Sequence, residues 1–226
     1  MTLHIFNELE QGSESWLAAR CGLPTASVIG KLITPSLKVA DNETSRGLTE
    51  TLVAERITGF VEYVHPSFDM QRGTMDEPFA RDLYSELHAP VDLIGFMTNR
   101  VDGITAGYSP DGLVASDGLI EIKSRKPKVQ LSTILSDTVP RENMGQLQMG
   151  LLISGRDWID YCSYAGGWPL HVIRVLPDPA WQQVIRDALA QFEDNAAQMI
   201  GAYNAATDGK PVAPRIDHYE DEGFTF

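Results

Sequence analysis

The stretch from Tyr108 to Lys126 constrains this chain most, because it predicts charged side chains within an apolar β-hairpin. Asp111 lies in a Pro-Asp-Gly turn, which fixes the backbone and leaves the carboxylate at the end of a strand. The return strand spans residues 119–124, and Glu121 and Lys123 share one of its faces because side chains alternate with period two. We therefore expect the three charged groups to meet.

This hairpin admits two interpretations. In the first, Asp111 only makes a turn, and Glu121 and Lys123 form an exposed charge pair. In the second, the three form a site for metal-assisted phosphodiester hydrolysis, since carboxylate oxygens suit Mg²⁺ and a lysine can orient the attacking water. The return strand is apolar enough to be central, and inward-facing charges are costly there unless they are paired or bind a metal. The sequence favours the second interpretation.

Length and composition are those of a globular protein. The 226 residues, 43% of them hydrophobic, predict one domain over residues 1–208 and an extended tail over 209–226. Phe224 and Phe226 of this tail could dock on a partner chain or be loosely ordered. The N-terminus lacks the basic flank and apolar core of a signal peptide, and no run of 18 apolar residues occurs, so we expect a cytoplasmic protein without membrane contact. Cys21 and Cys162 predict reduced core thiols, and two cysteines are too few for an iron–sulfur cluster.

The charge balance argues against a protein that coats nucleic acid over its whole surface. Lysine and arginine number 18 and acidic residues 31, which gives a net charge of −13. Positive charge is concentrated directly after the hairpin, in the four cations Lys123, Arg125, Lys126 and Lys128. An acidic exterior with a basic inner groove is compatible with gripping DNA in a channel.

Hydrophobic periodicity predicts an α/β protein (an α+β arrangement). Helices are expected over residues 13–20, 26–33, 43–58, 75–87, 143–154 and 179–204, and strands over 91–96, 104–109, 159–164 and 170–176, in addition to the hairpin. In the helix over 75–87, Phe79, Leu83 and Leu87 are expected on the buried face. Residues 60–72 are expected to be irregular, and 129–140 to form a polar loop.

Arg20 and Ser27 flank the predicted start of the second helix at Thr25. Free amides at a helix N-terminus favour a phosphate, so an anion site is one interpretation of these residues. The other, which the residues alone favour, is that Arg20 is a surface cation and that Thr25 or Ser27 merely caps the helix.

These patterns together resemble a known family. Asp111 followed by Glu121-x-Lys123 resembles the PD-(D/E)xK nuclease motif, and the chain is more narrowly similar to the phage lambda exonuclease (YqaJ-type viral recombinase) family. The matching pieces are Trp16…Arg20 with Gly22 and Thr25-Ala26-Ser27, Gly73…Glu77, Ser109-Pro110-Asp111-Gly112, Glu121-Ile122-Lys123 and Gln146-Leu147-Gln148. They span residues 11 to 150. The resemblance implies a restriction-endonuclease-like core, with a central mixed sheet flanked by helices and a long C-terminal helix.

The resemblance also implies roles for these residues. It implies that Asp111, Glu121, Glu77 and the backbone carbonyl of Ile122 hold two Mg²⁺ ions, for which Mn²⁺ can substitute, and that Lys123 orients the water. It implies a 5′-phosphate site formed by Arg20, Ser27, Ser109 and Gln146, of which Gln146 is also a candidate catalytic residue. It further implies a strand wedge at Met70 and DNA contacts at Arg125, Lys126 and Lys128. By residue type alone, Glu77 could instead be an acid at a helix start, Met70 core and Gln146 solvated.

The function that follows is a Mg²⁺-dependent exonuclease. We expect it to degrade one strand of linear double-stranded DNA processively from a 5′-phosphate end, leaving 3′ tails for recombination by strand annealing. The resemblance further implies a homotrimeric ring, a single-strand annealing protein as partner, and a phage or prophage origin within a bacterial host cell. The alternatives are a PD-(D/E)xK endonuclease or repair nuclease, or a non-catalytic module that binds DNA ends.

Overall fold

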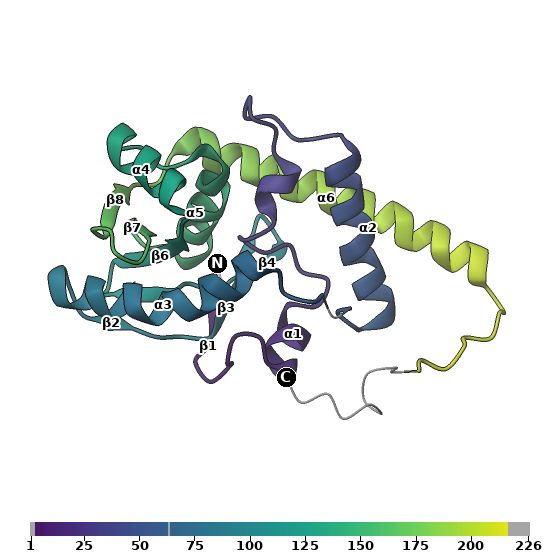
Figure 1. Cartoon of the computed structure of the whole chain (residues 1–226). Helices are drawn as coiled ribbons and strands as arrows, with labels where there is room; N and C mark the ends of the chain where they lie inside the picture. Colours follow the sequence, from purple (N-terminus) through teal and green to yellow (C-terminus); the bar gives the residue numbers. More distant parts are fainter. Residues whose placement is uncertain (1–2, 63, 217–226) are drawn as a thin grey trace.

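The computed structural model describes residues 3–62 and 64–216, and Figure 1 shows their arrangement. In chain order the elements are β1 (His4–Phe6), α1 (Glu14–Arg20), a 3-10 helix (Ile29–Leu32), α2 (Glu43–Thr58), α3 (Phe68–Leu87), β2 (Val91–Asp92), β3 (Phe96–Val101), β4 (Ile104–Tyr108), β5 (Gly112–Val114), β6 (Gly118–Ser124), α4 (Pro127–Ser136), α5 (Arg141–Ser154), β7 (Trp158–Tyr164), β8 (His171–Val175) and α6 (Pro179–Thr207). No helix among the described residues is both long and apolar enough to span a membrane. Phe224 and Phe226 lie outside the described residues.

Two sheets form the framework. The larger is mixed, with strand order β2-β5-β6-β7-β8, in which β6 and β7 are parallel and the other neighbours antiparallel. The chain crosses from β6 to β7 through α4 and α5. The smaller sheet, β1-β3-β4, is antiparallel. The predicted central hairpin is confirmed as β5 and β6, where Leu119 lies opposite Leu113.

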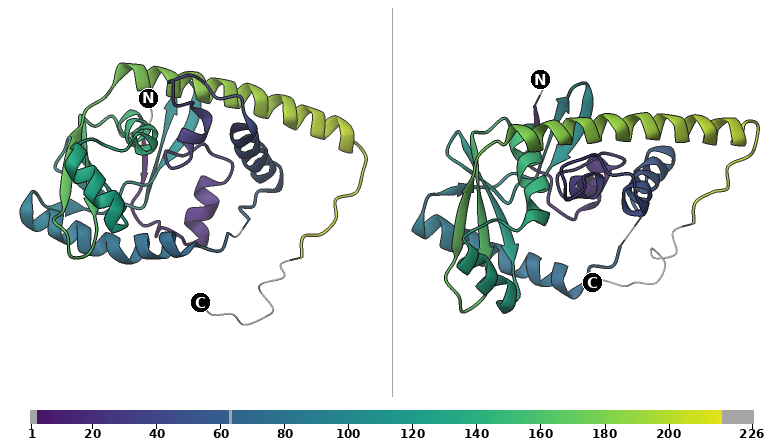
Figure 2. Two further views of the ribbon diagram at one scale, coloured as in Figure 1. Left: turned by 45° about the horizontal axis from the view of Figure 1, so that its top comes forward. Right: turned by 90° about the horizontal axis from the view of Figure 1, so that it is seen from above.

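The helices cover the larger sheet from two sides. Both views in Figure 2 place α6 along one side of the molecule and α3 along the opposite side. The main core packs α5 and α6 against the sheet, whereas Ala80 and Tyr84 of α3 pack on Ile120, Ile122 and Cys162 in a second cluster. Asp178 caps α6 by accepting from the Ala180 amide at 2.8 Å, and Pro179 at the first helical position suits its start. The long C-terminal helix is therefore confirmed.

A buried polar group ties α3 to the sheet. Asp160 of β7 is 3% exposed, and both its oxygens accept from Arg174 of β8, at 2.8 and 2.9 Å. The Tyr84 hydroxyl donates to the same carboxylate at 2.7 Å. Because both carboxylate oxygens of Asp160 have hydrogen-bond donors, the buried charge is compatible with a stable core. The bond from Tyr84 fixes the position of α3 on the sheet.

Two expected helical boundaries are wrong. The segment expected as a helix over 26–33 contains only the 3-10 turn, because Thr25 forms a parallel bridge with Gly107 and the Ala26 amide donates to the Gly107 carbonyl at 2.9 Å. The backbone there pairs with β4 instead of opening a helix. Within the expected irregular stretch 60–72, α3 begins at Phe68, since the Ser67 side chain caps it by accepting from the Met70 amide.

Three further expectations are corrected. The expected polar loop over 129–140 is largely the helix α4, in which buried Gln130 donates to the Ser163 carbonyl at 3.1 Å. Of the expected strand over 91–96, only Val91 and Asp92 form a short strand, β2, and the strand β3 over Phe96–Val101 was not anticipated. Phe79 and Leu87 are 66% and 59% exposed, because Ala80 and Tyr84 occupy the face of α3 that meets the sheet.

Candidate active site

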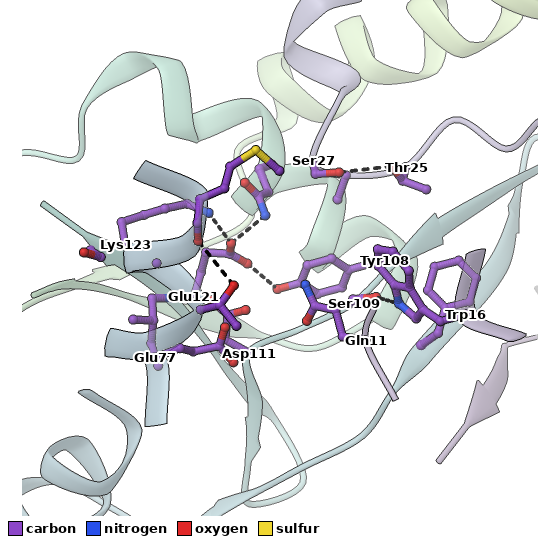
Figure 3. Close-up of a pocket in the computed structure, with 18 of the residues that line it drawn as sticks. Gln11, Trp16, Thr25, Ser27, Glu77, Tyr108, Ser109, Asp111, Glu121 and Lys123 are labelled. Carbon is purple, nitrogen blue, oxygen red and sulfur yellow. Dashed lines mark hydrogen bonds and ion pairs between the residues drawn. The ribbon is translucent and has the colours of Figure 1, made fainter. Parts of the chain in front are cut away.

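The expected charged groups of the hairpin meet in one pocket of about 500 Å³. Figure 3 shows that it is lined from α1, the segment 25–27, α3, the β4–β5 turn, β6 and α5. Of the residues predicted for the site, the pocket is lined by Arg20, Ser27, Met70, Glu77, Ser109, Asp111, Glu121, Ile122, Lys123 and Gln146. Elements far apart in the sequence therefore converge on it.

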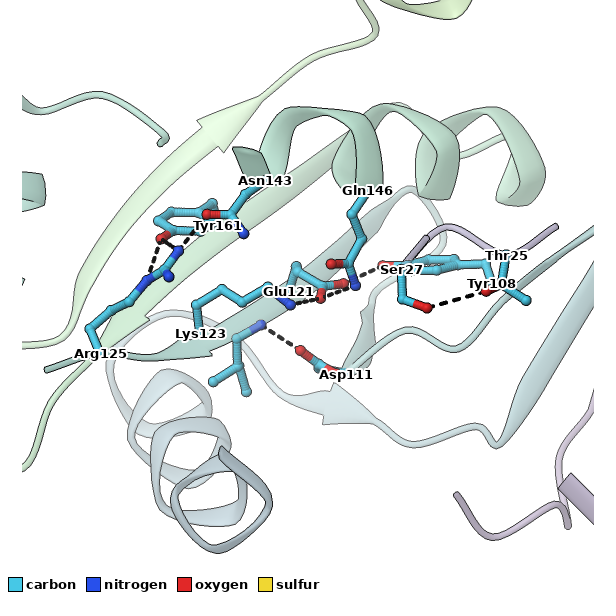
Figure 4. A network of polar contacts seen from close by, with 11 residues as sticks. Thr25, Ser27, Tyr108, Asp111, Glu121, Lys123, Arg125, Asn143, Gln146 and Tyr161 are labelled. Carbon is cyan, nitrogen blue, oxygen red and sulfur yellow. Dashed lines mark hydrogen bonds and ion pairs between the residues drawn. The ribbon is translucent and has the colours of Figure 1, made fainter. Parts of the chain in front are cut away.

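Glu121 is the centre of a hydrogen-bond network. Its side chain is 1% exposed because β6 is the middle strand of the larger sheet. One oxygen, Oε1, accepts from Lys123 Nζ at 2.7 Å and from Gln146 Nε2, and the other, Oε2, accepts from the Tyr108 hydroxyl at 3.1 Å. Figure 4 shows these donors around the carboxylate. They compensate the buried charge, as the cost of an unpaired ion requires.

Asp111 lies beside this network at the turn between β4 and β5. Its Oδ2 atom accepts from the Ile122 amide at 2.6 Å, which orients the carboxylate toward β6. Burial raises the pKa of Asp111 well above its ordinary value, and the charges of Glu121 and Glu77 raise it further. Ionised Asp111 is therefore repelled by its neighbours, so a cation bound among them would be stabilised.

Glu77 brings a third carboxylate from the opposite side, on α3. It forms an ion pair with Arg81, one turn later on the same helix, and the Arg81 Nε atom donates to the Asp111 carbonyl at 2.9 Å. Burial and the charge of Glu121 raise the pKa of Glu77, whereas Arg81 opposes the shift. Arg81 was not identified from the sequence, although its i+4 spacing from Glu77 was a usable signal.

Lys123 supplies positive charge to the acids. Burial alone would lower its pKa, but the charges of Glu121 and Asp111 raise it, so the group is a firmly held ammonium. Lys123 therefore suits the stabilisation of negative charge that develops in a reaction.

The donor set fits a divalent cation. Three carboxylates from three elements face one pocket, and hard oxygen ligands of this kind are those that Mg²⁺ prefers. Among the described residues, no group of three or more His, Cys, Asp or Glu side chains is arranged so that it could hold a metal ion. Oxygens of two of the acids contact protein donors instead, because Arg81 pairs with Glu77 and the Ile122 amide donates to Asp111. Binding a cation would exchange some of these contacts.

A second polar cluster occupies another part of the pocket. The Arg20 guanidinium lies 4.0 Å from the centroid of the Trp16 ring and donates to Thr25 Oγ1 at 3.2 Å, and Thr25 in turn contacts Ser27 Oγ at 3.2 Å. The Trp16 indole N–H donates to Ser109 Oγ at 2.9 Å. Three of the residues predicted to hold a phosphate therefore gather here, through side chains instead of the free helix amides that the sequence suggested.

Gln146 and Met70 lie outside this cluster. Gln146 lines the pocket beside Glu121, to which it donates. Met70 is 57% exposed in the first turn of α3, at the edge of the pocket. The roles of both residues stay predictions.

The basic run after β6 is less open than its sequence suggests. Arg125 donates to the Tyr161 hydroxyl and to Asn143, and Lys126 pairs with Asp69 at 3.0 Å. Lys128 is exposed on the first turn of α4. Only Lys123 of the four lines the pocket, so the other three stay predictions as DNA contacts.

Fold and site together define the class of protein. A mixed central sheet flanked by helices, with acids on its hairpin, is the restriction-endonuclease-like fold. A family model, the YqaJ-like viral recombinase domain, matches residues 15–157, and the chain belongs to that family.

Solved structures support this assignment. The chain is similar to an alkaline exonuclease (LHK-Exo) from Laribacter hongkongensis, with 29% identity and a TM-score of 0.76 over 86% of this chain and 98% of that one. The same figures hold for LHK-Exo solved in complex with dAMP. A phage-related exonuclease from Haemophilus somnus 129PT shares the fold, with a TM-score of 0.61 and 12% identity over 80% of this chain and 96% of that one. No curated protein sequence matches the chain.

Proposed function

We propose that the protein is a Mg²⁺-dependent deoxyribonuclease that degrades one strand of linear duplex DNA processively from a 5′ end and leaves 3′ single-stranded tails. The observation that carries the proposal is that one pocket contains three carboxylates, a lysine and a separate arginine–hydroxyl cluster. An exonuclease needs both a hydrolytic centre and a way to recognise an end. The likeness at 29% identity to a protein named as an alkaline exonuclease supports the same activity.

In this proposal Asp111, Glu121, Glu77 and the Ile122 carbonyl hold two Mg²⁺ ions, with Mn²⁺ as a substitute. Bound metal would supply an activated water and stabilise the charge on the reacting phosphate. Lys123 and Gln146 orient the Glu121 carboxylate, and Lys123 holds its positive charge next to the position of the developing negative charge.

The direct test is digestion of linear duplex DNA labelled at either end, with and without Mg²⁺. We expect release of nucleotides from the 5′ end only, and only with a divalent cation. Covalently closed circular DNA serves as the control, because an exonuclease leaves it intact and an endonuclease or repair nuclease cuts it. Binding of DNA ends without any hydrolysis would identify a non-catalytic module instead.

End recognition is assigned to the cluster of Arg20, Ser27 and Ser109. Arg20→Ala removes a partly buried cation that can hold a phosphate, so we expect about 10- to 100-fold slower digestion of 5′-phosphorylated ends and little change on 5′-hydroxyl ends. Initial rates on the two substrates measure this. Arg46→Ala, on the exposed start of α2, is the matched control and should leave both rates unchanged. Equal losses on both substrates for Arg20→Ala would contradict the assignment.

Processivity is assigned to a homotrimeric ring, because a monomer of net charge −13 would readily dissociate from DNA. Light scattering tests this, and we expect three times the mass of one chain. We also propose that the protein acts in the cytoplasm of a bacterial host, together with a single-strand annealing protein that receives the 3′ tails.

A further inference from the structure

Tyr108, the last residue of β4, contacts the candidate active site from inside the molecule. Its side chain is 1% exposed, and its hydroxyl donates to Glu121 Oε2 at 3.1 Å. Lys123 and Gln146 both donate to the other oxygen, Oε1. Among the described residues, Tyr108 is therefore the side chain that holds Oε2, and without it this oxygen of a buried carboxylate loses its side-chain donor.

The direction of the Tyr108 ring is set by α5. A Cβ atom built on Gly150 would lie 2.8 Å from Tyr108 Cζ, closer than such contacts occur, so the ring occupies space that exists because residue 150 has no side chain. Gln146 precedes Gly150 by four residues and so lies on the same face of α5. One face of α5 thus carries Gln146, which donates to Oε1, and Gly150, which leaves space for Tyr108, the donor to Oε2.

A buried tyrosine hydroxyl generally finds some partner, so the hydrogen bond alone does not establish a role. The chain offers a matched comparison in Tyr84. It is also 1% exposed, and its hydroxyl donates to the buried carboxylate of Asp160, which does not line the pocket. Tyr84 is a satisfied core residue, whereas the partner of Tyr108 is a predicted metal ligand that must present an oxygen to the pocket.

We propose that Tyr108 is a positioning residue of this site, whose hydroxyl fixes the Glu121 carboxylate in the orientation that receives the cation, and that Gly150 fixes Tyr108. The inference rests on the proposed metal-dependent function. Tyr108 lines the pocket with an uncharged ring, Gly150 does not line it, and both act through Glu121.

The test is the variant Tyr108→Phe, which keeps the ring and removes one oxygen atom. Mn²⁺ binding is measured by isothermal titration calorimetry on the full chain without DNA. Because a hydrogen bond to a charged group is lost, we expect about tenfold weaker Mn²⁺ affinity. In digestion assays the Mg²⁺ midpoint should rise by a similar factor, while the rate at saturating Mg²⁺ and the KM for DNA stay within about twofold of the parent protein.

Two further variants separate positioning from packing. Tyr84→Phe should lower the melting temperature without changing Mn²⁺ affinity, because its partner lies outside the site. Gly150→Ala should displace the ring and weaken Mn²⁺ binding as Tyr108→Phe does, and should cost no further affinity in the Tyr108→Phe background. An additive loss in the double variant would show that Gly150 acts by another route.

The outcome that overturns the proposal is unchanged Mn²⁺ affinity in Tyr108→Phe. Failure of the proposed function has a different signature: the parent protein would bind Mn²⁺ and leave linear duplex DNA intact, while the comparison of affinities between parent and variant still decides the role of Tyr108. A parent protein that binds no Mn²⁺ would refute both.

Discussion

Replacing Asp111 with asparagine is expected to abolish DNA hydrolysis and, without metal, to make the protein more stable. Asparagine keeps an oxygen for the Ile122 amide but removes the charge that a divalent cation requires. We expect a fall in rate of at least about 10³-fold at saturating Mg²⁺, since bound metal contributes several kcal/mol to such reactions. The rate of nucleotide release from 5′-labelled duplex measures the loss.

The gain in stability follows from the sign of the pKa shift. The pKa of Asp111 is higher in the folded protein than in the unfolded chain, because of burial and of the charges of Glu121 and Glu77. Ionising this carboxyl therefore opposes folding, at a cost that develops as the pH rises above the unfolded pKa and is complete above the folded one. The Asp111→Asn variant avoids that cost, so at neutral pH without metal we expect a melting temperature higher by roughly 2–8 °C.

The same sign predicts the pH dependence. The advantage of Asp111→Asn should shrink as the pH falls, because the parent carboxyl then becomes protonated, and Mg²⁺ should stabilise the parent protein but not the variant. Asp187→Asn, on the exposed face of α6, is the control. It should leave the melting temperature unchanged both with and without Mg²⁺. A variant less stable than the parent at neutral pH would show that the three acids do not repel one another.

Replacing Lys123 with alanine is expected to slow hydrolysis by about 10²- to 10⁴-fold, the range for loss of a group that assists proton transfer or stabilises developing charge. The effect on stability should be opposite to that of Asp111→Asn. Without the ammonium, Glu121 loses a donor at 2.7 Å and the acids repel one another more strongly. We therefore expect a lower melting temperature without metal and a larger stabilisation by Mg²⁺.

Lys38→Ala, in the loop before α2, is the matched control for Lys123→Ala. Calorimetry with and without Mg²⁺ measures the melting temperatures of both variants and of the parent protein. If Lys123→Ala digested linear duplex at the parent rate, the lysine would have no part in the reaction.

The hairpin could be predicted from sequence because its information is local. A Pro-Asp-Gly turn places Asp111 directly before β5, and period-two alternation places Glu121 and Lys123 on one face of β6. The structure brings all three into one pocket. The resemblance to a family then located Glu77 and Gln146, which come from α3 and α5 and which local pattern could not connect to the hairpin.

What the sequence did not reveal depends on tertiary contacts. Tyr108 has the pattern of any apolar strand residue, and its role becomes visible only when Gly150 of α5 lies against its ring. Arg81 likewise acts on Asp111 through a backbone carbonyl of another element. The helix α4 was missed because its polar face is buried: Gln130 is 0% exposed and donates to the carbonyls of Ser163 and Pro169.

The ion pairs of Asp69 have a consequence for salt dependence. This carboxylate at the edge of the pocket pairs with Arg72 at 2.7 Å and with Lys126 at 3.0 Å. In the proposed complex, a DNA phosphate that binds Arg72 or Lys126 replaces the Asp69 carboxylate as the partner of that cation. This exchange releases fewer counterions than a contact with a lysine that has no ion-pair partner. The affinity for DNA should therefore fall only gently as ionic strength rises.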